Sequence, residues 1–154
     1  MAMLNSRFRM VDIAEKPEEQ REALATGKLR LRKTTVELLR KGRTEKGNPL
    51  AAAEIAAILA AKRTSEVIPL CHPLSISEVK ATGKIVDDGV TVEALVRATG
   101  KTGVEMEALV AAAIYLLTVW DMTKQYEKDE KGQYPFTAIE EIRVVRKVKR
   151  NVRK

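Results

Sequence analysis

A short polar turn at residues 87–89 constrains the fold of this chain more than any other feature. Asp87, Asp88 and Gly89 tolerate positive φ angles, which a tight connection between antiparallel strands requires. We interpret residues 74–86 and 89–98, on either side of this turn, as the two strands of a β-hairpin. The fold therefore contains antiparallel β-sheet.

Helices and further strands are predicted around the hairpin. Asn48 precedes Pro49, so a capping side chain stands ahead of a proline at the first position of an Ala-rich helix. After the hairpin, apolar side chains recur at spacings of three and four, which indicates a long helix. Interspersed helices and strands predict an α+β fold with an antiparallel sheet packed against helices. The other predicted elements are strands at 28–32 and 139–148 and helices at 34–40, 49–62 and 103–128.

Length and composition predict one globular domain over residues 1–154, with 45% hydrophobic and 32% charged side chains. Cys71 is the only cysteine, so no intrachain disulfide can form, which favours a cytoplasmic location. The longest apolar-rich stretch, residues 108–120, is too short to span a bilayer. We therefore expect no membrane span and no export signal.

The net charge of +7 is concentrated near the carboxyl end of the chain. Residues 142–154 hold seven of the 28 basic side chains and none of the 21 acidic ones, so the rest of the chain is neutral. A nucleic-acid binder more often carries its basic face on the folded body, with aromatic side chains for stacking. We therefore expect no nucleic-acid partner.

The segment at residues 68–73, between two prolines, is a candidate binding strip. Each proline pushes its predecessor out of the helical region, so Leu70 to His72 should be extended and expose backbone groups to a ligand. Neighbouring side chains of an extended strip point to opposite sides, so Cys71 and His72 do not form a nucleophile–base pair. One cysteine and one histidine also cannot supply a structural zinc site, and no metal site is predicted. The alternative is a rigid turn with a buried thiol.

The glycine-flanked turn at residues 99–103 leads into the long predicted helix. It lacks the phosphate-binding motif of nucleotide triphosphatases, because Leu95 stands where that motif requires glycine. A turn of this kind can still bind an anion at the amino end of a helix, or it can be an ordinary connection. A phosphotransferase is the alternative function that it supports.

Four charged residues form a second group of candidates. Asp121 and Lys124 lie three apart on one helix face, where they can share a proton relay or form a plain surface ion pair. Lys46 precedes the Ala-rich helix, where it can attract phosphate. Lys62 lies seven residues after Ile55, on the face that we expect to point inward.

The spacing along the long helix has a consequence for assembly. Glu107 and Asp121 are fourteen residues apart, which corresponds to about 21 Å of helix. One straight helix cannot bring both ends to one small substrate. If both ends carry chemistry, a second copy of the chain completes the site, which predicts a homo-oligomer with interfacial sites.

Five segments, taken together and in this order, resemble the cyclic pyranopterin monophosphate synthase family, also called molybdenum cofactor biosynthesis protein C. The resemblance covers about residues 10–147 and leaves 148–154 as a basic tail. It implies a ferredoxin-like fold and a homohexamer built as a trimer of dimers, with pockets at the dimer interface. The segments are residues 10–12 (Met-Val-Asp), 60–64, 68–74, 99–109 and 121–124.

The resemblance also implies an activity. The enzyme would be a lyase of molybdenum cofactor biosynthesis that converts 3′,8-cyclo-7,8-dihydroguanosine triphosphate to cyclic pyranopterin monophosphate and releases diphosphate. No redox cofactor is required because the rearrangement is internally balanced, and whether Mg²⁺ accompanies the triphosphate stays open. The alternative is a non-catalytic ferredoxin-like module that binds nucleic acid or a small ligand.

Site residues are carried over from the family motifs. Asp121 would be the principal acid/base, with Lys124 as its partner and Lys46 beside them. Lys147 is the best match for a family lysine that precedes a glycine-rich segment, which is absent here, and Lys149 is the alternative. The substrate-binding residues would be Leu70, Cys71, His72, Glu105, Met106, Glu107, Lys62, Arg21 and Lys147.

Overall fold

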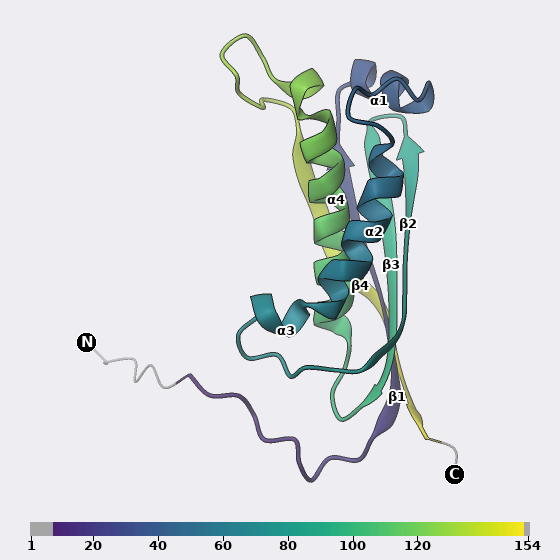
Figure 1. Cartoon of the computed structure of the whole chain (residues 1–154), viewed down its shortest axis with the longest axis vertical. Helices are drawn as coiled ribbons and strands as arrows, with labels where there is room; N and C mark the ends of the chain where they lie inside the picture. Colours follow the sequence, from purple (N-terminus) through teal and green to yellow (C-terminus); the bar gives the residue numbers. More distant parts are fainter. Residues whose placement is uncertain (1–7, 153–154) are drawn as a thin grey trace, which may run out of the picture.

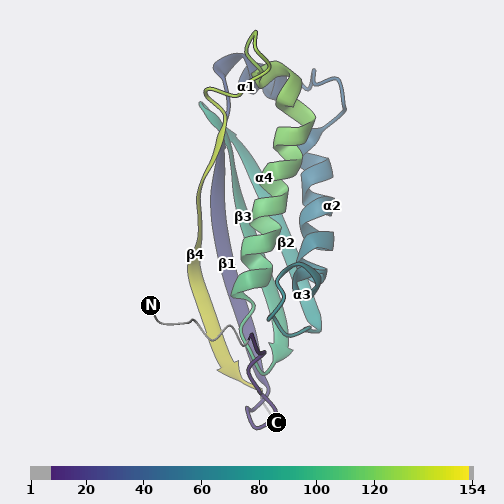
Figure 2. The same cartoon turned by 90° about the vertical axis from the view of Figure 1, so that its left-hand side faces the viewer.

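A four-stranded antiparallel sheet with helices on one face makes up the computed structural model, which describes residues 8–152 (Figures 1 and 2). The strand order is β2-β3-β1-β4, and the chain order β-α-β-β-α-β is that of a ferredoxin-like fold. The predicted α+β architecture is confirmed. The elements are β1 (Glu19–Arg30), α1 (Lys33–Arg40), α2 (Pro49–Lys62), α3 (Thr64–Val67), β2 (Ile76–Val86), β3 (Gly89–Gly100), α4 (Glu105–Glu127) and β4 (Ala138–Asn151).

The hairpin between β2 and β3 is confirmed at the predicted turn. Val86 pairs with Gly89, and Asp87 and Asp88 form the connection. Gly89 has a φ of 154°, and a Cβ at this position would lie 1.8 Å from the carbonyl oxygen of Leu29 in β1. Only glycine fits, because the turn lies against the backbone of the neighbouring strand.

Both long helices begin and end close to the predicted positions. Asn48 caps α2 as expected, since its Oδ1 accepts hydrogen bonds from the N–H groups of Leu50 (3.1 Å) and Ala51 (3.2 Å). α4 is one unbroken helix of 23 residues. Its length and apolarity would also suit a membrane span, but it packs as a core helix against α2 and the sheet (Figure 2).

Small side chains form the contact between the helices and the sheet. Ala53, Ala57 and Ala61 of α2 recur at every fourth position and are fully or almost fully buried. α4 buries Ala108 and Ala111 in the same core. Because alanines occupy these positions, the helices approach each other and the sheet closely.

The inward face of α2 differs from the prediction. The buried alanines leave Ile55 63% exposed and Leu59 48% exposed, and Lys62 is exposed as well. The expectation that Lys62 points inward was therefore wrong. The prediction used the larger side chain of Ile55 to mark the buried face of α2. The helices and the sheet approach so closely, however, that only alanine fits on the face that is buried.

The strands β1 and β4 are longer than predicted. β1 begins at Glu19 rather than Lys28 and ends at Arg30, because its hydrogen bonds to both β3 and β4 hold a sequence with weak strand propensity in extended form. β4 continues to Asn151, so residues 148–151 of the expected tail pair with β1. The short helix α3 was not predicted.

Candidate functional site

The candidate residues lie at the two ends of α4. Glu105 and Glu107 stand in its first turn, while Asp121 and Lys124 lie toward its end. α2 runs beside α4 in the opposite direction, so that the loop before α2 lies at the end of α4 and the end of α2 lies near its start (Figure 1). The structure therefore separates the predicted residues into two groups, as the helix-length argument expected.

The α4-end cluster consists of Lys46, Asp121 and Lys124. The Nζ of Lys124 donates to Oδ1 of Asp121 at 2.8 Å. The Nζ of Lys46 donates to the backbone carbonyl of Asp121 at 3.1 Å and lies 3.4 Å from its Oδ2. The hydrogen bond from Lys124 and the charges of both lysines lower the pKa of Asp121, and Asp121 in turn raises the pKa of Lys124. The cluster is thus an ionised carboxylate between two ammonium groups.

Two neighbours of this cluster were missed by the sequence analysis. The backbone N–H of Glu45 donates to the hydroxyl of Tyr126 at 2.9 Å, and the side-chain amide of Gln125 donates to the carboxylate of Glu45 at 2.9 Å. These bonds attach the loop that carries Lys46 to the last turns of α4. Gly47 closes the loop with a φ of 103°. No sequence signal marks Tyr126 or Gln125, because both are ordinary polar residues of a helix end.

A buried carboxylate anchors the end of α4. Glu127 is 0% exposed and accepts hydrogen bonds from the backbone N–H of Arg32 at 3.0 Å and from the hydroxyl of Thr137 at 2.6 Å. The hydroxyl of Thr35 is its third donor. Glu127 thereby joins α4 to the start of α1 and to the segment that enters β4.

The α4-start cluster surrounds an open pocket of about 390 Å³. The pocket combines residues 70–72 with the first turn of α4. The expectation that Leu70 is extended was wrong, because the N–H of Cys71 donates to the carbonyl of Ile68 at 3.1 Å and closes a turn over Leu70. His72 contributes one imidazole nitrogen to a 2.7 Å contact with the carbonyl oxygen of Val11. The pocket is lined by Leu70, Cys71, His72, Thr102, Gly103, Glu105, Met106 and Glu107.

The two carboxylates of this pocket differ in their electrostatic environment. Burial, together with the nearby charge of Glu105, raises the pKa of Glu107, which is 4% exposed. Burial is the largest single effect on Glu105 and opposes ionisation, but the 3.0 Å ion pair with Lys147, a backbone hydrogen bond and the charge of Arg21 together outweigh it and lower the pKa of Glu105. Burial and the charge of Glu107 raise the pKa of Cys71, so its thiol is not an activated nucleophile.

Basic residues of β1 and β4 lie beside the start of α4. Lys147 bonds to Glu105, while Arg21 and Lys149 both pair with Glu19, at 2.8 and 3.3 Å. The Nε of Arg21 is buried and has no hydrogen-bond partner within residues 8–152. The charge of Arg21 acts on Glu105 and helps to lower the pKa of that carboxylate.

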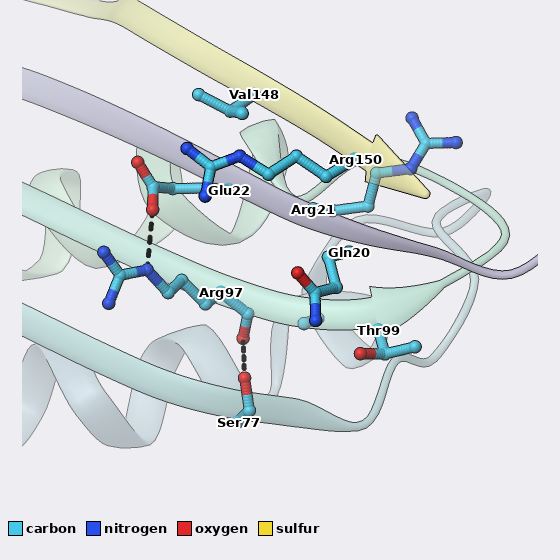
Figure 3. Close-up of a pocket in the computed structure, with 9 residues that line it drawn as sticks. Gln20, Arg21, Glu22, Ser77, Arg97, Thr99, Val148 and Arg150 are labelled. Atoms are coloured by element: carbon cyan, nitrogen blue, oxygen red, sulfur yellow. Dashed lines mark hydrogen bonds and ion pairs between the residues drawn. The ribbon is translucent and has the colours of Figure 1, made fainter. Parts of the chain in front are cut away.

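A second pocket, of about 190 Å³, lies on the sheet face opposite the helices (Figure 3). Arg97 crosses it and bonds to Glu22 and Glu78, each at 2.6 Å, and Arg146 pairs with Glu22 at 3.0 Å. Arg21 is the only predicted site residue that lines this pocket. The other predicted site residues do not line this pocket.

Comparisons with a family model and with individual known proteins point to the same family. The model of a family described as the MoaC family matches residues 10–149. The chain is 53% identical to a protein of Pyrococcus furiosus and 54% identical to one of Thermococcus kodakarensis, over 92% of this chain and 90% of each relative. It is 51% identical to a protein of Sulfolobus acidocaldarius, over 91% of this chain and 98% of that protein. All three relatives are named probable cyclic pyranopterin monophosphate synthase.

Proposed function

Because the chain belongs to the MoaC family, we propose that it is a cyclic pyranopterin monophosphate synthase. It converts 3′,8-cyclo-7,8-dihydroguanosine triphosphate to cyclic pyranopterin monophosphate with release of diphosphate, in molybdenum cofactor biosynthesis. The family match over residues 10–149 is the observation that carries this proposal. The arrangement of carboxylates and basic groups at the two ends of α4 agrees with it.

The α4-end cluster supplies the acid/base chemistry. Ring opening and pterin closure move several protons, and a carboxylate hydrogen-bonded to an ammonium group can accept a proton and return it. Asp121 is the principal acid/base in this proposal, with Lys124 as its partner. Lys46 stabilises negative charge as diphosphate leaves, because its ammonium group is held beside Asp121 by the loop contacts of Glu45.

The α4-start cluster binds the substrate. Leu70, Cys71 and His72 face the pterin, and Met106 lies beside them. Glu107 has the higher pKa of the two carboxylates, which suits a proton donor, while Glu105 stays ionised and holds Lys147. Arg21, Lys147 and Lys62 are the basic groups for the triphosphate.

A second copy of the chain completes the site in this proposal. Two α4 helices that pack antiparallel about a two-fold axis place the start of one beside the end of the other. Exposed apolar side chains between the two clusters support such a contact. They are Ile55 and Leu59 on α2 and Leu117 on α4, each more than 40% exposed. We further propose the homohexamer, a trimer of such dimers.

The remaining expectations belong to the same proposal. We propose a cytoplasmic enzyme that needs no redox cofactor and that has no nucleic-acid or membrane partner. Turnover measured with EDTA and with added Mg²⁺ would decide whether the triphosphate is used as its magnesium complex.

The proposed function is tested by direct turnover. The purified protein is incubated anaerobically with the cyclised guanosine triphosphate, and diphosphate and the pterin product are followed by mass spectrometry. The expected result is formation of both products by the wild-type chain, strongly reduced formation by the Asp121→Asn variant and none by the heat-inactivated protein. Absence of both products with the wild-type chain would overturn the proposal, and nucleic-acid binding without turnover would favour the non-catalytic alternative.

A further inference from the structure

The segment before β1, residues 8–18, extends past the ends of the strands, and its residues are almost all exposed (Figure 1). We call it the N-terminal strap. It contains the Met10-Val11-Asp12 sequence, which the resemblance singled out and to which the proposed function gives no role. The Oδ1 of Asp12 accepts from the N–H of Ala14 at 2.9 Å, which gives this part of the strap a defined turn.

Two contacts join the strap to the α4-start cluster. The Nζ of Lys101 donates to the carbonyl of Ala14 at 2.8 Å, and Lys101 belongs to the turn between β3 and α4. The carbonyl oxygen of Val11 lies 2.7 Å from Nε2 of His72, one of the residues that line the pocket. The strap is thus attached both to the turn that leads into α4 and to the binding strip.

The contact with Val11 determines which nitrogen of His72 carries a proton. A carbonyl oxygen only accepts hydrogen bonds, so Nε2 must be the donor. In a neutral imidazole the other nitrogen is then unprotonated. Nδ1 is therefore the only nitrogen of this ring that can accept a proton or a hydrogen bond from a ligand.

We propose that the N-terminal strap is a positioning element of the substrate pocket, in which the Val11 carbonyl holds His72 as the Nε2–H tautomer and leaves Nδ1 to act on the substrate. Val11 acts through His72 and does not itself need to touch the substrate. The predicted effect of the strap on turnover rests on the proposed function. The tautomer of His72 does not, because it follows from the contact with Val11 alone. Met10-Val11-Asp12 thereby acquires a role in the site.

His72 is the only histidine of the chain, which makes the tautomer directly measurable. The full-length protein is labelled with ¹⁵N-histidine, and two-bond ¹H–¹⁵N correlation spectra are recorded at a pH at which the ring is neutral. We expect a protonated Nε2 and an unprotonated Nδ1. A predominant Nδ1–H form, or an even mixture of the two tautomers, would overturn the proposal.

A pair of strap variants tests the effect on turnover. Lys101→Ala removes the bond to Ala14, so we expect both tautomers to be populated and turnover to fall about fivefold, the effect of one lost hydrogen bond. Lys16→Ala is the matched control on the strap, because only its backbone N–H makes a bond among residues 8–152, and both readouts should stay at wild-type values. Lower turnover in Lys101→Ala with an unchanged Nε2–H signal would contradict the positioning role.

Failure of this inference is distinguishable from failure of the proposed function. A wild-type protein that forms the pterin but shows the Nδ1–H tautomer retains its function and overturns the role of the strap. A protein that shows the Nε2–H tautomer but forms no product overturns the function and leaves the tautomer assignment standing.

Discussion

The ammonium group of Lys46 lies 3.4 Å from the carboxylate of Asp121, although 75 residues separate the two in the chain. Lys46 comes from the loop before α2 and Asp121 from the far part of α4, so this contact depends on the antiparallel packing of the two helices. It gives the α4-end cluster a second ammonium group beside the one that Lys124 provides.

Replacement of Asp121 tests the proposed acid/base. Asp121→Asn should lower kcat by about 10² to 10⁴, the range for removal of a general acid/base. Stability should change little, because exposed ion pairs contribute about 0–1 kcal/mol and the Asp121 side chain is 59% exposed. Steady-state kinetics and thermal unfolding measure the two effects. The matched control is Asp87→Asn, which removes another exposed carboxylate, paired with Arg40, and should keep full activity. Full activity of Asp121→Asn would contradict the assignment.

Tyr126 should act only through Lys46. Tyr126→Phe removes the acceptor for the N–H of Glu45 and should lower kcat/KM about fivefold by loosening the Lys46 loop. In a Lys46→Ala background the same change should have almost no further effect, because the group that it positions is already gone. The double-mutant cycle measures this coupling. Equal losses in both backgrounds would show that Tyr126 acts independently of Lys46.

Glu127 should be a main determinant of stability. Glu127→Ala leaves the N–H of Arg32 and the hydroxyls of Thr35 and Thr137 without their buried acceptor, which should cost about 1–3 kcal/mol for each donor that stays unpaired. Urea denaturation measures the loss. Glu130→Ala, an exposed carboxylate three residues further on, should change stability by less than about 0.5 kcal/mol. A loss of that small size in Glu127→Ala would mean that water replaces the carboxylate at no cost.

Glu107 gives a pH-dependent prediction. Its pKa is raised by burial, so the folded state holds this proton more tightly than the unfolded state does, and the ionised form opposes folding at neutral pH. Glu107→Gln should therefore raise the free energy of unfolding at pH 7. The gain should shrink as the pH falls through the folded-state pKa and be lost below the unfolded-state pKa. Denaturation at pH 7 and at pH 4 tests this sign.

The control for that experiment is Glu105→Gln, because the pKa of Glu105 is shifted in the opposite direction. Its ionised form is stabilised in the folded state, chiefly by Lys147 against the effect of burial, so Glu105→Gln should lower stability at pH 7. The difference in stability between the wild-type protein and Glu105→Gln should also disappear as the pH falls through the folded-state pKa of Glu105. If both variants were more stable than the wild type at pH 7, or both less stable, the opposite pKa shifts assigned to Glu105 and Glu107 would be contradicted.

The exposed aliphatic side chains of α2 should hold two copies together. Ile55→Lys introduces a charge at a side chain that is 63% exposed in the single chain, so folding of the chain should persist while the dimer dissociates. Light scattering measures the mass, and circular dichroism the fold. Val145→Lys, on the β4 edge and 46% exposed, is the matched control and should leave the contact between helices intact. If the oligomer of Ile55→Lys kept the mass of the wild-type oligomer, the contact between the two copies would not involve this face of α2.

Local sequence signals predicted a large part of the fold. Gly89 and the two aspartates before it marked the hairpin, and Asn48 with Pro49 marked the start of α2. β1 was largely missed, because Ala23, Ala25 and Gly27 carry little strand propensity of their own. They form a strand because β3 and β4 supply hydrogen bonds on both sides.

The sequence by itself determined the residue types of the candidate site, the helix that carries Glu107 and Asp121 at opposite ends, and the family. These features are local or follow from the order of motifs along the chain. Only the tertiary structure decided that Lys46 meets Asp121, that Val11 meets His72 and that alanines rather than Ile55 face the core. Each of these depends on how closely helices and sheet approach, and that distance is set by packing between elements far apart in the sequence.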